Sequence, residues 1–431
     1  MSGAVTARPA VRPSSARSGQ AASGKAPVRV CIVYPAEPLG VIPGGIDTFI
    51  KGVLRWAPPD IAFELLGITT DPGKAQPRRW MTCSLDGEKE FRFYPVLALQ
   101  NSERQSPVPV ALRFLLGLLR QRVRTAADVL EFHRIEPWLA FARDPRPKHL
   151  VMHQNMQDLR NFGSDIRWRH LPSLYFRLED YIFPRMSSVF CVREDAADAY
   201  RARFPHMRRR IEFTPTWMDP DTFRLRDEGA RLRARQALRL TFGFPEDAFV
   251  LVTVGRLDRQ KNPLLLLEAF RLLHESMPEL RLVFIGDGVL RPQLEERIAA
   301  AGLGSHVRLD GVQPPATIAE RLAGADLFVL SSAYEGMPIV VLEALASGLP
   351  VAATDVGEVS RVVRPGISGE LVDRHEPAAL ARAIRTCRDS IARYRGTPCV
   401  EAVRPFTPPA VLEPIYENYR ILARQGSRDM A

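Results

Sequence analysis

The sequence predicts an α/β protein built from two doubly wound, Rossmann-like domains that face a central cleft. Its 431 residues exceed what a single hydrophobic core usually serves, so at least two domains are expected. Short runs rich in β-branched residues alternate with helical patterns of about 10 to 15 residues, which is typical of parallel sheets. Apolar residues make up 46% of the chain and charged residues 25%, a composition that suits a globular protein.

The first domain is predicted over residues 28–220, after a basic tail at 1–27 that is expected to be disordered. The segment VRVCIVYP at 28–35 predicts a buried parallel strand, because it is a short β-branched run that ends at a proline. A Gly-rich turn and a helical pattern at 48–56 follow it. Further strands are expected at 61–67, 128–132, 149–152 and 188–192.

The second domain is predicted over residues 221–405, and a charged, strand-poor stretch at 224–247 indicates the junction between the domains. A last helix within 406–431 is expected to cross back to the first domain. Two sheets of this kind place their ligand site in the crevice beyond the carboxyl ends of the strands. The strands of the second domain are expected at 249–254, 281–285, 326–331 and 350–354, and its helices at 263–275, 290–301 and from Pro338.

The net charge of +10 is unevenly distributed along the chain. The first thirty residues carry five basic and no acidic side chains, residues 31–225 carry 28 basic and 23 acidic ones, and the remainder has 26 of each. No apolar stretch reaches the length of a membrane span, and residues 1–26 lack the apolar core of a secretory signal. The five cysteines, odd in number and never CxxC, argue against a disulfide framework and a zinc site, and favour a reducing cytoplasm.

The most informative segment is SSAYEGMPIVVLEALASGLPVAATDVGE, at 331–358. A strand ends at its start, a loop with Gly336 follows, and Pro338 stands where a helix is expected to begin. The free N–H groups near Met337 and Ile339, together with the helix dipole, would attract an anion. This arrangement suits a phosphate group.

Glu335 and Glu343 lie eight positions apart in the same segment, the second about two turns into the expected helix. Because a phosphate would repel carboxylates, we expect the two side chains to accept hydrogen bonds from sugar and ribose hydroxyls. Two glutamates at this spacing recur by chance in most proteins of this length. Their placement between a strand, a Gly-Pro loop and a helix start is what makes the signal specific.

A second segment, TVGRLDRQKNP at 253–263, places Arg256 and Lys261 directly after the first strand of the second domain. Two permanent cations at this edge would stabilise the charge that develops on a diphosphate leaving group. The alternative is a solvated loop with ordinary surface cations. Gly44 and Gly45, in PGGI after the first strand of the chain, would let the backbone approach a ligand closely, or form only a tight turn.

Together these segments resemble the retaining glycosyltransferases of the GT-B fold, often called family four or group one. The resemblance covers about residues 28–425 and is strongest over 250–373. It implies a metal-independent, hexosyltransferase-type reaction that moves a sugar from a nucleotide-diphosphate sugar to an acceptor hydroxyl with retention of configuration. In that family Glu335 would face the hydroxyls of the donor sugar and Glu343 those of the nucleotide ribose.

The resemblance also implies the remaining donor contacts. Arg256 and Lys261 match the pair that clamps the donor diphosphate, and Gly286 and Asp287, in IGDG, match a loop beside the nucleotide base. The glycine loop after the first strand matches one that closes over the diphosphate. The implied donor-binding residues are Gly44, Gly45, Arg256, Lys261, Gly286, Asp287, Glu335, Gly336, Met337, Ile339 and Glu343, and the implied catalytic residues are His133, Glu335, Arg256 and Lys261.

His133, in DVLEFHR, matches the second histidine of the family's HxH pattern at a strand end, and Glu131 stands at the first position. The family histidine lies near the anomeric region of the donor, so His133 is the first candidate from the first domain. His153, in VMHQN, follows another strand and makes a weaker case. The alternative for either is a packed or surface histidine at a strand end.

The sequence departs from the family pattern at two places. The junction reads TPTWMDPDTF, with Thr216 and Trp217 where the family has Asn and Gly. Arg193 stands at the end of a strand where the family has Ser. Both departures lie near the expected hinge and the acceptor side, so they bear on those features more than on donor binding.

A formal DxD motif, Asp219 and Asp221, competes with this interpretation, because paired carboxylates bind the metal in the other glycosyltransferase fold. Here the pair falls in the junction and not after a strand of a nucleotide-binding domain. The sequence therefore predicts no metal site and no cofactor, with Arg256 and Lys261 in the role of the metal.

The segment PVPVALRFLLGLLRQRVRTAA at 107–127 is basic, amphipathic and free of acidic residues. It predicts a helix that packs on the first sheet, and it also suits an anionic membrane surface beside a lipid-linked glycan acceptor. Nucleic acid is not expected as a partner, because no aromatic platform or recognition motif accompanies the basic residues.

The chain is therefore expected to be a glycosyltransferase of surface polysaccharide or glycolipid assembly, located in the cytoplasm or peripherally at the inner face of its membrane. Three alternatives remain open: a nucleotide-sugar epimerase or phosphorylase of the same architecture, a non-catalytic nucleotide-sugar-binding subunit, and a dinucleotide oxidoreductase. A phosphorylase would need a lysine signature for pyridoxal phosphate, and an oxidoreductase a GxGxxG after a strand, and neither pattern is present.

Overall fold

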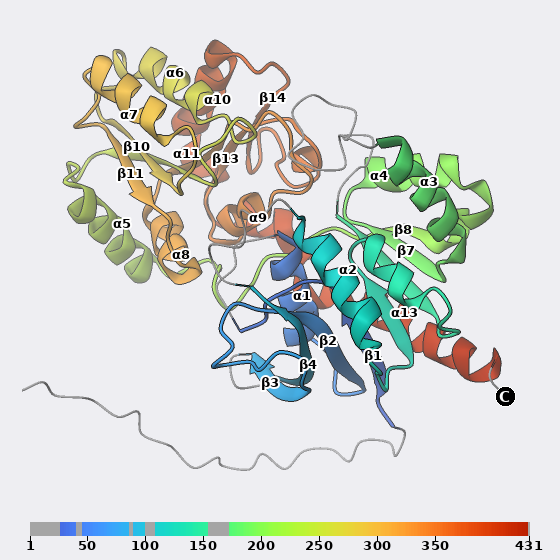
Figure 1. Ribbon diagram of the computed structural model, residues 1–431. Helices are drawn as coiled ribbons and strands as arrows, with labels where there is room; N and C mark the ends of the chain where they lie inside the picture. Colours follow the sequence, from blue (N-terminus) through green and yellow to red (C-terminus); the bar gives the residue numbers. More distant parts are fainter. Residues whose placement is uncertain (1–25, 40–44, 86–88, 100–107, 154–171, 430–431) are drawn as a thin grey trace, which may run out of the picture.

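The computed structural model describes residues 26–39, 45–85, 89–99, 108–153 and 172–429. It contains two α/β domains, each with its own parallel sheet, and Figure 1 shows them as two lobes coloured blue to green and yellow to orange. The predicted fold class is therefore confirmed. The predicted basic tail lies outside the described residues.

The N-terminal sheet has eight strands in the order β3-β4-β2-β1-β5-β6-β7-β8. All neighbouring pairs are parallel except β3 with β4, which is antiparallel. The predicted β-branched runs form its centre, where residues 30–33 of β1 and all of β5 are fully buried. The strands are β1 (Val28–Val33), β2 (Ile61–Thr69), β3 (Met81–Leu85), β4 (Lys89–Ala98), β5 (Val129–Phe132), β6 (Lys148–Met152), β7 (Ser188–Cys191) and β8 (Ile211–Phe213).

Helices cover this sheet, and α2 packs as the amphipathic pattern predicts. It turns Phe114 and Leu118 into the core and leaves a second apolar stripe exposed to solvent. The helices of the domain are α1 (Gly45–Arg55), α2 (Val110–Gln121), α3 (Pro172–Ile182) and α4 (Glu194–Arg203), with shorter turns η2 (Glu136–Phe141), η5 (Phe183–Arg185) and η6 (Pro205–Arg210).

The C-terminal sheet has six strands, all parallel, in the order β11-β10-β9-β12-β13-β14. The strands are β9 (Phe249–Val254), β10 (Leu280–Ile285), β11 (Val307–Gly311), β12 (Leu327–Leu330), β13 (Val351–Thr354) and β14 (Gly369–Val372). The helices are α5 (Glu228–Phe242), α6 (Pro263–His274), α7 (Arg291–Ala300), α8 (Pro315–Gly324), α9 (Ile339–Ala346), α10 (Pro377–Asp389), α11 (Ile391–Tyr394) and α12 (Thr397–Val403), with turns η7 (Val359–Arg361) and η8 (Arg404–Phe406).

The stretch interpreted as a junction, 224–247, is mostly helical. Its helix, α5, packs against α8 within the C-terminal domain. Asp227 caps the first turn by accepting a hydrogen bond from the N–H of Ala230 at 2.8 Å, and Gly243 ends the helix in the left-handed conformation. The charged composition concealed the helix because its face toward the sheet carries arginine as well as leucine.

Helix α13 (Pro408–Asp429) packs against β1 and β5 of the N-terminal sheet, although it follows the C-terminal domain in sequence (Figure 1). Leu412, Ile415 and Tyr419 are fully or almost fully buried there. The hydroxyl of Tyr416 donates a hydrogen bond to the carbonyl oxygen of Val53 in α1, at 2.9 Å. The last helix is thus part of the core of the first domain.

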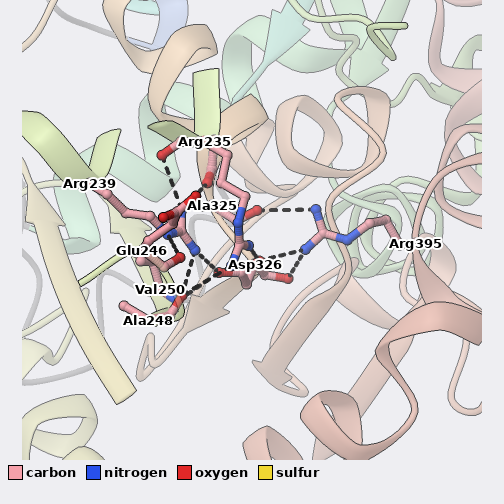
Figure 2. A network of polar contacts seen from close by, with 9 residues as sticks. Arg235, Arg239, Glu246, Ala248, Val250, Ala325, Asp326 and Arg395 are labelled. Carbon is pink, nitrogen blue, oxygen red and sulfur yellow. Dashed lines mark hydrogen bonds and ion pairs between the residues drawn. The ribbon is translucent and has the colours of Figure 1, made fainter. Parts of the chain in front are cut away.

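A buried ionic network holds the amino-terminal edge of the second sheet (Figure 2). Asp326, just before β12, accepts hydrogen bonds from the N–H of Val250 at 2.9 Å and from Arg239 at 2.6 Å. Arg235 pairs with the other carboxylate oxygen, and Arg395 donates to the carbonyl of Asp326 at 2.7 Å. The network joins α5, β9, β12 and the segment before α12 on the side of the sheet opposite its carboxyl ends.

The five cysteines, Cys31, Cys83, Cys191, Cys387 and Cys399, are all buried free thiols. Burial raises the pKa of each thiol. Within the described part of the chain, no helix is long and apolar enough to cross a bilayer.

Candidate active site

A hollow of about 290 Å³, part of it open to solvent, lies at the carboxyl edge of the C-terminal sheet. The ends of β9, β10 and β12 line it, together with the loop that follows β9. This loop brings the two predicted cations, Arg256 and Lys261, to the same hollow. Two of its other lining residues, Ser331 and Ser332, follow β12.

Lys261 and Glu335 form the central contact of this site. The Nζ atom of Lys261 lies 2.6 Å from Oε1 of Glu335, and the hydroxyl of Ser332 donates to the same oxygen at 2.6 Å. Glu335 is only 7% exposed, so its carboxylate needs both partners. Ser332 is in turn held by Thr354, whose hydroxyl donates to its carbonyl oxygen at 2.7 Å. Sequence spacing gave no signal for Ser332 or Thr354.

Backbone contacts position Lys261. Its N–H donates to the carboxylate of Asp258 at 2.9 Å, and the hydroxyl of Ser331 donates to its carbonyl oxygen at 3.0 Å. The next residue, Asn262, takes the left-handed conformation (φ 46°) that starts α6. The loop thus turns sharply and is bound to the neighbouring strand end.

Arg256 is much less constrained than Lys261. Its side chain is 66% exposed, and its guanidinium lies 3.2 Å from both the carboxylate of Asp258 and the side-chain oxygen of Gln260. A flexible, solvated guanidinium at the rim of the hollow can turn toward an incoming anion at little cost.

Glycines hold the loops after β9 and β10 against each other. Gly286 adopts φ 139°, and a Cβ atom there would lie 1.9 Å from the carbonyl oxygen of Gly255. A Cβ at Gly288 would lie 2.5 Å from the carbonyl oxygen of Leu257. Between these glycines, Asp287 accepts a hydrogen bond from the N–H of Gly288 at 2.7 Å. The predicted base-side loop therefore packs directly on the cation loop.

The predicted helix after Pro338 is present as α9, with Pro338 as its N-terminal cap residue and Met337 nearly buried before it. Glu343 is half-buried on this helix. Burial, together with the smaller effect of the negative charge of Asp219, raises the pKa of Glu343 to about 8. At neutral pH a carboxyl group with this pKa is mostly protonated, so it can donate as well as accept a hydrogen bond.

The loop of Glu335 and Gly336 also meets the N-terminal domain. A Cβ atom at Gly336 would lie 3.4 Å from Cγ of Arg193, two residues after the end of β7. The N–H of Glu194 donates to the carboxylate of Glu358 at 3.0 Å, and Arg361 pairs with both glutamates. The carboxyl edges of the two sheets thus face each other at the loop of Glu335 and Gly336.

The remaining predicted residues lie at several different places. Gly44 lies outside the described residues, and Gly45 is the exposed first residue of α1. His133 is buried with its side chain fully inaccessible, and its ring bonds to Glu131 and to His153. His153 is the partly exposed member of this pair. Ile339, at the first turn of α9, is partly exposed beside the donor loop.

The formal DxD pair, Asp219 and Asp221, contacts α1, and so does Trp217 of the junction. Arg55 lies 2.9 Å from the carboxylate of Asp219 and 3.1 Å from that of Asp221. Trp217 packs against α1 so closely that a Cβ atom at Gly52 would lie 2.3 Å from its ring. Among the residues the structure describes, no group of three or more His, Cys, Asp or Glu side chains could hold a metal ion.

Sequence comparisons agree with this geometry. Residues 235–390 match the family model described as glycosyl transferases group 1. The D-inositol 3-phosphate glycosyltransferase 1 of Catenulispora acidiphila is 28% identical over 393 residues, 88% of this chain and 90% of that protein. The D-inositol 3-phosphate glycosyltransferase of Thermobispora bispora is 38% identical over 164 residues, which is 38% of that protein.

Solved structures share the fold at lower identity. Sucrose-phosphate synthase from Thermosynechococcus elongatus has a TM-score of 0.72 and 18% identity, covering 92% of this chain and 99% of that one. HepE from Anabaena, in complex with UDP-glucose, has a TM-score of 0.65 and 17% identity, covering 90% and 98%. The C-terminal domain of this chain is therefore similar to the group 1 glycosyltransferases, and the two-domain fold of the whole chain is shared with sucrose-phosphate synthase.

Proposed function

We propose that this enzyme transfers a hexosyl group from a nucleotide-diphosphate sugar to an acceptor hydroxyl, with retention of configuration and without a metal ion. The observation that carries the proposal is the hollow lined by Arg256 and Lys261, with Glu335 bound to the second cation. Of the fold relatives, HepE is described in complex with UDP-glucose, a donor of this class.

The site supplies positioning and charge for this reaction. Arg256 and Lys261 would stabilise the negative charge that builds on the diphosphate as the bond to the sugar breaks. Glu335, held in place by Lys261 and Ser332, would accept hydrogen bonds from sugar hydroxyls and orient the ring. The acceptor hydroxyl attacks from the face that the diphosphate leaves, and the leaving phosphate takes its proton. Facing domains would exclude water from the donor.

Product analysis tests the reaction. Incubation of the enzyme with UDP-, GDP- and ADP-sugars in the presence of EDTA is expected to give donor turnover, with an α-linked product from an α-linked donor by NMR. An inverted product contradicts retention, and turnover that needs added Mg²⁺ contradicts the role given to Arg256 and Lys261. Conversion of the donor sugar without acceptor indicates an epimerase, and absence of turnover with all donors a binding subunit.

A surface on the N-terminal domain supports a membrane-associated glycan acceptor, as in surface polysaccharide or glycolipid assembly. Leu112, Leu116 and Leu119 are 46%, 40% and 47% exposed on one face of α2. Arg120 and Arg122 are exposed at the end of the same helix, and no acidic residue occurs in it. Exposed leucines beside arginines match the apolar and anionic parts of a lipid surface. We propose that this face binds the membrane that carries the acceptor.

Vesicle flotation tests this surface. The enzyme is expected to float with phosphatidylglycerol vesicles at low salt and to be released at high salt, because screening weakens the arginine contribution. Replacing Leu116 and Leu119 with aspartate is expected to abolish flotation, since charge enters the apolar face. The matched control replaces Leu240 of α5, 86% exposed in the other domain, with aspartate, and it should leave flotation unchanged. Absence of flotation of the native enzyme at low salt would reject the membrane proposal.

A further inference from the structure

A chain of buried polar side chains runs through the N-terminal domain from α13 to the carboxyl edge of the sheet. It contains Tyr419 on α13, Glu131 on β5, and then His133 and His153, which follow β5 and β6. Glu131 and Tyr419 are completely buried, and His133 is 3% exposed. Buried polar groups at this density normally satisfy one another, so the direction of each hydrogen bond can be worked out from the groups that can only donate.

The first fixed donor is the side-chain amide of Asn418 on α13. Its nitrogen lies 3.0 Å from Oγ of Ser188 and 3.1 Å from Nδ1 of His149, and both atoms must accept. The Ser188 hydroxyl lies 2.7 Å from the same Nδ1 atom and donates to it. His149 therefore carries its hydrogen on Nε2, which lies 4.0 Å from Oε2 of Glu131.

The hydroxyl of Tyr419 donates to Oε2 of Glu131. Nε2 of His149 lies 4.0 Å from the same oxygen and forms no hydrogen bond with the described residues. The pKa of Glu131 is raised, mainly by burial, and the Tyr419 hydrogen bond offsets part of this rise. The hydrogen bond donated by Tyr419 favours the ionised carboxylate, which can only accept.

An accepting Glu131 decides the state of both following rings. Its Oε1 atom lies 2.8 Å from Nε2 of His133, so Nε2 carries the hydrogen. Nδ1 of His133 is then an acceptor and lies 2.8 Å from Nε2 of His153, which must donate. Burial lowers the pKa of His133 to about 3 and also lowers that of His153, so each ring keeps a single hydrogen. Nδ1 of His153 is left with a free electron pair.

Aromatic contacts hold the rings in this alignment. His133 and His153 are stacked with centroids 5.1 Å apart, and Phe49 of α1 packs edge-on against them, with its centroid 5.0 Å from that of His153. His153 follows β6, the neighbour of β7 in the sheet, and Arg193, two residues after β7, contacts the loop of Glu335 and Gly336. His153, which is partly exposed as a residue, therefore stands at the edge of the sheet that faces the C-terminal domain.

We propose that α13 sets the hydrogen-bond polarity of this edge: it holds Glu131 as an acceptor, so that His133 and His153 align head to tail and His153 offers Nδ1 as an acceptor to a substrate hydroxyl. Glu131, His133 and Tyr419 are positioning residues, and His153 is the residue that meets the substrate. The inference rests on the proposed transferase function, because a hydroxyl-bearing substrate must lie between the domains.

NMR of enzyme labelled with ¹⁵N-histidine shows directly which ring nitrogen of each histidine carries the hydrogen. The signals of His133, His149 and His153, assigned by single replacements, are expected to show the Nε2–H tautomer in all three rings. Glu131→Gln provides an amide that can donate to His133, and it is expected to turn His153 toward the Nδ1–H form. A native His153 that carries its hydrogen on Nδ1 would overturn the proposal.

Kinetics test the consequence with matched controls. Glu131→Gln is expected to lower kcat by at least about tenfold while KM for the donor stays within about twofold, since the donor site lies in the other domain. Glu64→Gln is the control, because Glu64 is a buried carboxylate of the same sheet that pairs with Arg92 at 2.9 Å. Equal kcat values for the two variants would contradict the proposal.

A second pair of variants covers the case in which Glu131→Gln does not fold. Tyr419→Phe removes the hydroxyl that bonds to Glu131, whereas Tyr416→Phe removes one that bonds only to a backbone carbonyl on the same helix. Only the first is expected to lower kcat and to shift the His153 tautomer. If the native enzyme shows no transfer at all, the proposed function fails, and the tautomer measurement still decides the polarity.

Discussion

Replacing Lys261 with methionine is expected to lower kcat/KM for the nucleotide-sugar donor by about a hundredfold or more. Loss of one preorganised charge at a leaving group typically has an effect of this size. Methionine keeps the length of the side chain but leaves Glu335, 7% exposed, without the cation 2.6 Å from its carboxylate. Initial rates at varied donor concentration measure the effect, and the loss is expected mainly in kcat.

Two further sets of variants show whether the lower kcat/KM of Lys261→Met results from losing the charge of Lys261 itself. Arg259 is an exposed cation two residues before Lys261 in the same loop, and Arg259→Met is expected to keep nearly full activity. Because Lys261 and Glu335 act as one unit, the double variant Lys261→Met with Glu335→Gln should lose less than the product of the two single losses. A Lys261→Met enzyme within about threefold of the native rate would contradict the proposed role.

The donor side of the site was predictable because its residues follow strands directly. Arg256 and Lys261 come after β9, and Glu335 comes after β12, its neighbour in the sheet. In a parallel sheet the carboxyl ends of adjacent strands meet at one edge, so order along the chain translates into proximity. The spacing did not predict the ion pair between Lys261 and Glu335. It also gave no sign of the contact that Ser332 makes with Glu335, because hydroxyl contacts of this kind have no periodic signature.

The N-terminal side was less predictable for a different physical reason. His133 was selected for its position at a strand end, but its side chain is inaccessible, and His153 is the partly exposed residue of the pair. The two are linked through contacts between β5, β6 and α13, which are far apart in the sequence. No local pattern indicates that Tyr419 would reach Glu131. Position at a strand end identifies the edge of the sheet, but not which side chain emerges from it.

The helix α5 was missed because its arginines looked like surface residues. Arg239 is one of four arginines in α5, yet it is 3% exposed and donates to the carbonyl oxygens of Glu246 and Ala248 as well as to Asp326. A guanidinium can be buried when every hydrogen finds an acceptor, and composition does not show whether acceptors are present. The strand β4 was missed although FRFYP alternates apolar and polar residues as a strand does.

Asp326→Asn is expected to destabilise the protein by about 3 to 5 kcal/mol, the usual result of leaving a buried charge without its partner. Asp326 is 5% exposed and pairs with Arg239 and Arg235, and burial already lowers the pKa of Arg239, so its charge is costly to retain without the carboxylate (Figure 2). Urea unfolding measures the change. Glu320→Gln, which breaks the exposed ion pair with Arg226, should cost less than about 1 kcal/mol.

The destabilisation expected for Asp326→Asn is attributed to the unpaired charge of Arg239 and not to loss of the hydrogen bond to β9. The side-chain oxygen of asparagine still accepts the N–H of Val250, so the strand contact persists in Asp326→Asn. Adding Arg239→Met removes the stranded charge and is expected to recover a large part of the stability, because an apolar replacement of both partners is often tolerated. If the double variant is less stable than Asp326→Asn, the carbonyl contacts of Arg239 matter more than its charge. The network lies at the amino edge of the sheet, away from Lys261 and Glu335. Below the unfolding temperature, kcat should therefore stay unchanged in Asp326→Asn, in its double variant with Arg239→Met, and in Glu320→Gln.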